Sequence, residues 1–104
     1  MEPFSPDAEG SVLEKEKQEI KEPRKFKVIL QNDDYTTFDF VVSVLVGIFQ
    51  KSITEAVKIT NDVHHKGSGI CGIYGKEIAE TKVDLVAKTA QEAGFPLRCT
   101  MEEV

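Results

Sequence analysis

The sequence Lys-Val-Ile-Leu-Gln-Asn-Asp-Asp-Tyr-Thr, from Lys27 to Thr36, changes from apolar to polar halfway along its length. Together with the preceding Phe26, its first half places Phe26, Val28 and Leu30 at alternate positions, which is typical of a strand with one face against a core. The second half consists of short polar side chains, so the first strand is expected to end at Gln31.

The stretch from Asn32 to Asp34 is expected to form a turn that leads into a helix. Short polar side chains of this kind hydrogen-bond their own backbone in turns. Thr36-x-x-Asp39 is then a capping box, and apolar residues recur at helical spacing as far as about Phe49.

Four further segments complete the pattern. A second helix is expected from the capping residue Ser52 to Gly67, a short strand over residues 69–74, a third helix over residues 79–93 and a half-buried strand over residues 97–102. Gly72 inside the short strand indicates a bulge or a close approach of backbone. The predicted fold is α+β, in the order β-α-α-β-α-β.

The length of 104 residues and the 40% hydrophobic content fit one domain. Residues 1–25, rich in Glu and Lys, are expected to be a flexible, disordered N-terminal extension, and residues 26–104 the core. A net charge of -5 argues against a nucleic-acid partner. The sequence shows no membrane span, so we expect a cytoplasmic protein without membrane contact. Cys71 and Cys99 are interpreted as buried free thiols, with a disulfide as the alternative.

Catalytic and metal sites are both disfavoured. A histidine such as His64 needs a nucleophile to activate, but Ser52 is used as a cap and Ser68 lies in a glycine-rich turn. His64 and His65 are adjacent, so on a helix they point about 100° apart and cannot share one ion as an i, i+4 pair does. No metal or cofactor is expected.

An ammonium group would suit the polar turn. Its three donors need three acceptors, and Asn32, Asp33 and a neutral His64 could supply them. An apolar flank for an attached side chain would come from Phe38, Val41, Val63 and Leu97. From the residues alone, the alternative is slightly favoured: Asn32 and Asp33 only form the turn, and His64 is a core histidine.

Five strings of sequence, in order and in spacing, resemble the ClpS family from about Phe26 to the C-terminus. They are the stretch from Lys27 to Thr36, Val63-His64, Gly-Ile-Cys-Gly at 69–72, Ala-Glu-Thr-Lys-Val at 79–83 and Pro-Leu-Arg-Cys-Thr at 96–100. ClpS proteins are adaptors, and not enzymes, that hand N-degron substrates to the ClpA or ClpC unfoldase of the ClpP protease. The resemblance implies a three-stranded antiparallel sheet covered by three helices.

The resemblance also implies roles for individual residues. Asn32, Asp33 and His64 would bind the substrate's α-ammonium group. A pocket for a first residue of Leu, Phe, Tyr or Trp would be formed by Asp34, Thr36, Phe38, Val41, Thr60, Val63 and Leu97. Glu77 and Lys82 would contact the N-terminal domain of a ClpA-like or ClpC-like unfoldase, and a monomer is expected.

Two positions depart from the family pattern, because Phe38 and Thr60 stand where methionines are usual. A rigid ring and a hydroxyl in place of flexible side chains would alter the volume and polarity of the pocket. The ranking of first residues would therefore change, but recognition of the α-amino group would not. The alternatives are a small interaction domain that ignores peptide N-termini, a metal-binding module and a small hydrolase.

Overall fold

The computed structural model describes residues 23–104. Its elements are β1 (Lys25–Gln31), α2 (Phe38–Gly47), α3 (Ile53–Lys66), β2 (Ser68–Gly75), α4 (Lys76–Ala93) and β3 (Arg98–Glu103). The predicted α+β class and the order β-α-α-β-α-β are confirmed. The expected N-terminal extension, as far as residue 22, lies outside the described residues.

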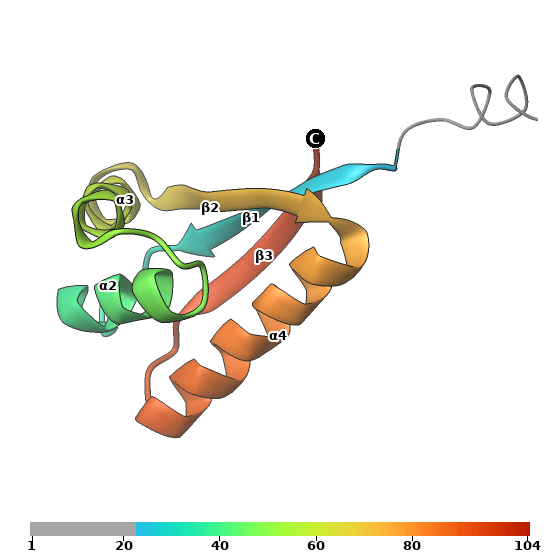
Figure 1. Ribbon diagram of the computed structural model, residues 1–104. Coiled ribbons are helices and arrows are strands. Elements are labelled where there is room, and N and C mark those ends of the chain that lie inside the picture. Colours follow the sequence, from blue (N-terminus) through green and yellow to red (C-terminus); the bar gives the residue numbers. More distant parts are fainter. Residues whose placement is uncertain (1–22) are drawn as a thin grey trace, which may run out of the picture.

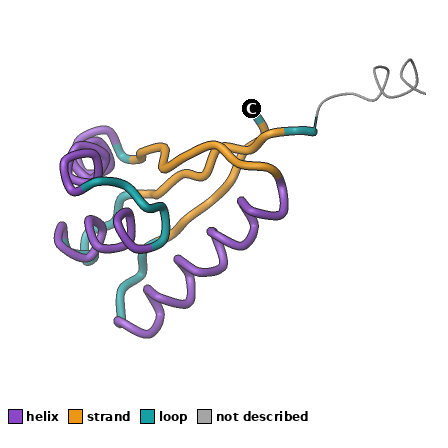
Figure 2. Tube along the Cα trace, viewed as in Figure 1, coloured by secondary structure: helices purple, strands orange, loops and turns teal. Residues whose placement is uncertain are grey.

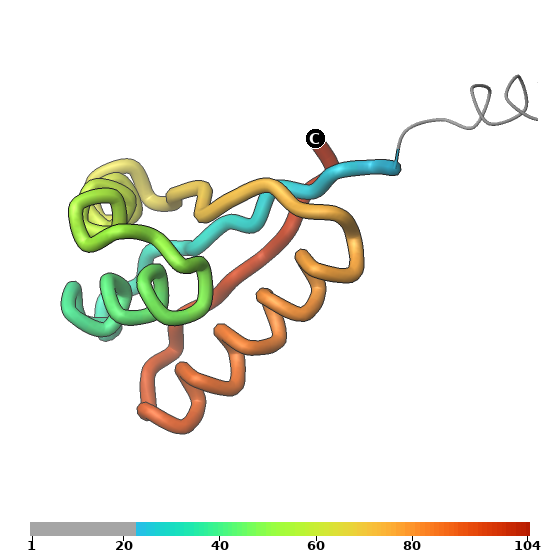
Figure 3. The backbone as a smooth tube through the Cα atoms, viewed as in Figure 1, coloured from blue at the N-terminus to red at the C-terminus, as the bar shows by residue number. Residues whose placement is uncertain are grey.

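The three strands form one antiparallel sheet in the order β2-β1-β3, with β1 in the centre (Figure 2). Helix α4 crosses one face of the sheet, whereas α2 and α3 gather at the end where β1 finishes (Figure 1). The C-terminus lies beside the start of β1 (Figure 3), where the Val104 N–H donates to the Lys25 carbonyl over 2.9 Å.

The core lies between this sheet face and the helices. Val28 and Leu30 of β1 are fully buried, as their alternation predicts. They pack with apolar side chains from every other element or its flanking loops: Val41, Val44, Leu45, Phe49, Ala56, Val63, Cys71, Ala79, Val86, Ala90 and Leu97. No helix within residues 23–104 is both long and apolar enough to cross a membrane.

The start of α2 differs by one residue from the prediction. Thr37 is the N-cap, and its side chain accepts a hydrogen bond from the Phe40 N–H at 3.1 Å. The predicted cap, Thr36, instead donates its hydroxyl hydrogen to Asp33. The Thr36 hydroxyl is therefore used in the turn, and Thr37 caps the helix. The other two expected signals hold, because Ser52 caps α3 and Gly67 ends it in the left-handed conformation, with φ 94°.

The strand has the bulge that Gly72 indicated, immediately before this glycine. The register of β2 against β1 shifts between Val28 and Ile29, which leaves Cys71 as the extra residue of a bulge. A Cβ atom on Gly72 would meet the end of the Tyr74 side chain, so a larger residue here would require that ring to move.

Both cysteines are free thiols. Burial, together with the neighbouring Cys99, raises the pKa of Cys71 far above its ordinary value. Burial alone raises the pKa of Cys99 to about 12. Since the thiolate is the reactive form, neither side chain is activated as a nucleophile.

Candidate functional site

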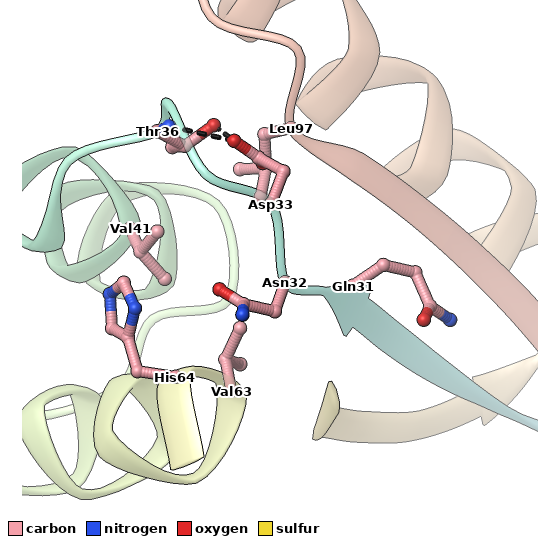
Figure 4. Close-up of a pocket in the computed structure, with 8 residues that line it drawn as sticks. All are labelled: Gln31, Asn32, Asp33, Thr36, Val41, Val63, His64 and Leu97. Carbon is pink, nitrogen blue, oxygen red and sulfur yellow. Dashed lines mark hydrogen bonds between the residues drawn. The ribbon is translucent and has the colours of Figure 1, made fainter. Parts of the chain in front are cut away.

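The candidate site is a hollow at the end of β1, where four segments converge (Figure 4). Its lining comes from β1 and the following turn, from α2, from α3 and from the loop before β3: Gln31, Asn32, Asp33, Thr36, Val41, Val63, His64 and Leu97. The empty space between them is about 150 Å³. Part of this space is open to the solvent.

Asn32 occupies the first position after β1. Its backbone N–H donates to the Gly67 carbonyl at 2.9 Å, which ties the end of the strand to the end of α3. Its side chain is exposed, and Figure 4 shows the amide turned toward Val63 and His64. The amide oxygen is thus held at the edge of the hollow.

Asp33 organises the turn through three hydrogen bonds. Its Oδ1 accepts from the backbone N–H groups of Tyr35 at 2.8 Å and Thr36 at 2.7 Å, and its Oδ2 accepts from the Thr36 hydroxyl at 2.7 Å. Burial acts to raise the pKa of Asp33. The hydrogen bonds from Thr36 and Tyr35 and the nearby His64 outweigh burial, so the pKa is lowered below 3.8. The carboxyl group is therefore a carboxylate at neutral pH.

His64 is half-buried, and its ring lies beside Val41, across the hollow from Asn32 (Figure 4). Its Nε2 atom is buried and has no hydrogen-bond partner among the described residues. The ring stacks instead on Phe38. A neutral imidazole has one acceptor nitrogen, and an unpartnered nitrogen in a pocket wall is the sort of group that a ligand can satisfy.

Apolar side chains line the hollow between these polar groups (Figure 4). Val41 and Val63 are each 1% exposed and Leu97 is 5% exposed, and all three belong to the core. The hollow thus combines an acceptor-rich rim with a rigid apolar wall.

Three of the predicted pocket residues are not among the side chains that line the hollow. Asp34 is exposed on the turn. Phe38 stacks on His64, and 36% of the Phe38 surface is exposed. Thr60 is fully buried, and its hydroxyl donates to the Ala56 carbonyl of its own helix at 2.7 Å. Its polarity is therefore satisfied away from the hollow.

Gln31 lines the hollow but was not predicted as a site residue. Figure 4 shows its side chain turned away from the other seven, and its amide donates to the Thr100 hydroxyl at 3.2 Å. Strand alternation alone places this side chain on the outer face of the sheet, so the sequence carries no signal for its position beside the site.

The predicted unfoldase contacts, Glu77 and Lys82, lie far from the hollow. Both are in the first two turns of α4, which begins where Gly75 pairs with Lys25. The hollow lies at the opposite end of β1, beside Gln31 (Figure 1). Two separate surfaces are therefore available, one at each end of the sheet.

The arrangement fits binding of a small cation that carries an apolar group. Asn32, Asp33 and His64 offer oxygen and nitrogen acceptors, which an ammonium group requires when it leaves water. Within residues 23–104, no group of three or more His, Cys, Asp or Glu side chains is arranged to hold a metal ion.

Comparison with known proteins gives a consistent family. Residues 21–100 match the model of the family described as ATP-dependent Clp protease adaptor protein ClpS. The ClpS adapter protein of Oleidesulfovibrio alaskensis is 59% identical over 87 residues, which are 84% of each chain. That of Wolinella succinogenes is 54% identical over 99 residues, or 92% of this chain and 97% of the relative. Agrobacterium tumefaciens ClpS2, solved with bound L-phenylalaninamide, has a TM-score of 0.77 and 37% identity, over 80% of this chain and 100% of that chain.

Proposed function

This chain belongs to the ClpS family of ATP-dependent Clp protease adaptors, which are not enzymes, and we propose that it recognises substrates by their first residue. The recognised feature is a free α-amino group followed by a bulky apolar side chain, namely Leu, Phe, Tyr or Trp. The bound substrate is then delivered to a Clp unfoldase in the cytoplasm.

The unpartnered Nε2 of His64 is the observation that carries the proposal. A buried polar atom without a partner costs about 1–3 kcal/mol in the free protein. The ring lines the same hollow as Asn32 and Asp33, so the three side chains border one space. A ligand with several donors offsets that cost, because it engages all three side chains together.

The α-ammonium group matches the acceptors that remain. Asp33 Oδ1 already accepts two hydrogen bonds, whereas Oδ2 accepts only one, so the free lone pair is on Oδ2. The Asn32 amide oxygen and one imidazole nitrogen complete the set. The competent pairing is a charged ligand with a neutral His64, since an imidazolium would repel the ammonium and offer no acceptor.

The first side chain of the substrate is proposed to enter against Val41, Val63 and Leu97. Full burial of one large apolar side chain contributes about 1.5–3 kcal/mol, which adds affinity to the hydrogen bonds of the amino group. L-Phenylalaninamide, the ligand of the Agrobacterium relative, has a free α-amino group and an aromatic side chain. This hollow offers polar acceptors for such an amino group and apolar side chains against which such a ring could pack.

Delivery is proposed to use the start of α4. Glu77 is exposed there, so it is accessible to the N-terminal domain of a ClpA-like or ClpC-like unfoldase. Because this surface and the hollow lie at opposite ends of the sheet, substrate and unfoldase can bind at the same time. Residues 1–22, which include many charged side chains, are proposed to assist the hand-over.

The decisive test compares a fluorescent peptide that begins with Leu with the same peptide N-acetylated. Acetylation removes the charge and two donors, and hydrogen bonds to charged groups contribute about 1.5–3 kcal/mol each, so affinity should fall by at least roughly 100-fold. Equal affinity of the two peptides would reject the ammonium model and leave a general interaction domain. Turnover of the peptide, or stoichiometric metal in the purified protein, would instead support the hydrolase or the metal-binding module.

A further inference from the structure

Lys82 of α4 reaches across to the end of α2. Its Nζ donates to the Ile48 carbonyl at 2.7 Å, 34 residues earlier in the chain. Ile48 is the residue that caps the C-terminal end of α2. The ammonium group is therefore engaged within the protein.

The end of α2 needs such a donor. The last carbonyls of a helix have no intrahelical partner, and a positive charge near them is favourable to the helix dipole. α2 has no basic residue in its own last turn, and Ile48 keeps a right-handed conformation. Just beyond it, Gln50 has a φ of 57° and the Lys51 N–H donates to the Leu45 carbonyl at 3.0 Å, which leaves the Ile48 carbonyl to Lys82. Lys82 supplies from another helix a positive charge and a donor for the Ile48 carbonyl.

Two aromatic rings hold the ammonium group in this position. Its Nζ lies 5.8 Å from the ring centroid of Phe49 and 5.4 Å from that of Tyr74. Such contacts strengthen when the cation is partly removed from water, and Lys82 is half-buried. The hydrogen bond and the two rings join α4, the end of α2 and β2 at one point.

The opposite end of α2 forms part of the candidate site. Val41 lines the hollow, and Phe38 stacks on His64. α2 has ten residues, and an isolated helix of that length is marginal in water. Its ten residues span about 15 Å, so a change in tilt at Ile48 moves the wall that carries Val41.

We propose that Lys82 is a positioning residue of the substrate pocket: by holding the C-terminal end of α2, it fixes the wall against which the first side chain packs. This inference rests on the proposed function. It differs from an unfoldase contact, because a residue that acts only in docking does not affect peptide binding when no unfoldase is present.

The experiment measures affinity for a Leu-initiated peptide by fluorescence anisotropy, without unfoldase. Lys82→Met keeps most of the aliphatic chain and removes the ammonium group, whereas Lys82→Arg keeps a positive donor. Glu77→Gln is the matched control, since Glu77 is exposed on the same helix and makes no hydrogen bond or ion pair among the described residues.

Lys82→Met should weaken peptide binding by roughly three- to tenfold. The variant loses one charged hydrogen bond and two cation–π contacts, and only part of that free energy is expected to reach the pocket. Lys82→Arg should restore at least part of the affinity, and Glu77→Gln should bind as the wild type does. In the full-length protein, hydrogen exchange followed by NMR should be faster in Lys82→Met for the amides at the end of α2 and unchanged for those of α3.

Wild-type affinity in Lys82→Met, or unchanged exchange at the end of α2, would overturn the inference. If the wild type itself fails to bind the free peptide, the proposed function fails. The exchange measurement then still decides whether Lys82 holds α2, because it needs no ligand.

Discussion

The rings of Phe38 and His64 stack almost in parallel, with their centroids 5.5 Å apart and their planes inclined by 9°. Phe38 is the first residue of α2, and His64 lies in the last turn of α3, so the contact joins the two helices beside the hollow. Since Nε2 of His64 has no hydrogen-bond partner within residues 23–104, packing against Phe38 orients the imidazole. The ring keeps its acceptor nitrogen for a ligand, at some loss of stability.

Replacing His64 by Leu is expected to abolish peptide binding and leave the stability nearly unchanged. The substitution removes a buried nitrogen whose missing hydrogen bond costs about 1–3 kcal/mol, which offsets the lost ring stack, worth about 0.5–1.5 kcal/mol. Urea unfolding should give a free energy of unfolding within about 1 kcal/mol of the wild type. His65→Leu is the control, because His65 is exposed, and it should bind normally. Persistent binding by His64→Leu would exclude the imidazole as an acceptor.

Replacing Phe38 by Ala should change selectivity more than stability. Phe38 is 36% exposed, so the loss should stay below the about 3–5 kcal/mol of a buried phenylalanine. Removal of the ring opens the edge of the hollow beside His64, and a Trp-initiated peptide should gain affinity relative to a Leu-initiated one by up to roughly tenfold. A panel of peptides that differ only in the first residue measures this ratio. An unchanged ratio would show that Phe38 does not limit the pocket.

Thr60 should behave as a core residue. Its hydroxyl donates to the Ala56 carbonyl of its own helix, so Thr60→Val removes donor and polarity together and should change the free energy of unfolding by less than about 1 kcal/mol. Thr60→Met adds volume to a fully buried site and should destabilise by about 1–3 kcal/mol. Thermal unfolding distinguishes the two variants. A change in first-residue selectivity in Thr60→Val would contradict this assignment and return Thr60 to the pocket.

The features that local sequence could predict are those that depend on local chemistry. The alternation around Val28 and Leu30 gives the central strand, and the cap Ser52 and the stop Gly67 give the bounds of α3. The order of elements follows from such signals, and so does the position of Asn32 and Asp33 directly after a strand. The family resemblance was needed to favour a binding site over a simple turn.

The features that the sequence could not predict depend on which atoms meet after folding. Whether Thr36 or Thr37 caps α2 is decided by Asp33, which takes the hydroxyl of the first threonine. The direction of the Thr60 hydroxyl and the bond from Lys82 to Ile48 depend equally on the final packing. The types and spacing of residues along the chain do not show which of several possible hydrogen-bond partners a side chain takes in the folded protein.

Asp33 should make the stability of the protein sensitive to acid. Its pKa in the folded protein is lowered below 3.8, because the hydrogen bonds from Thr36 and Tyr35 outweigh the effect of burial. The unfolded chain therefore takes up the proton first as pH falls. The stabilisation is complete above about pH 4–5 and is lost as pH falls through the lower pKa of the folded state. Asp33→Asn should thus lower the free energy of unfolding by about 1 kcal/mol near neutral pH, and the difference from wild type should shrink as pH falls through the lowered pKa of Asp33. Asp34→Asn changes the net charge equally and is the control, and urea unfolding across this pH range measures both. A deficit of Asp33→Asn that persists undiminished in acid would mean that the carboxylate charge does not stabilise the turn.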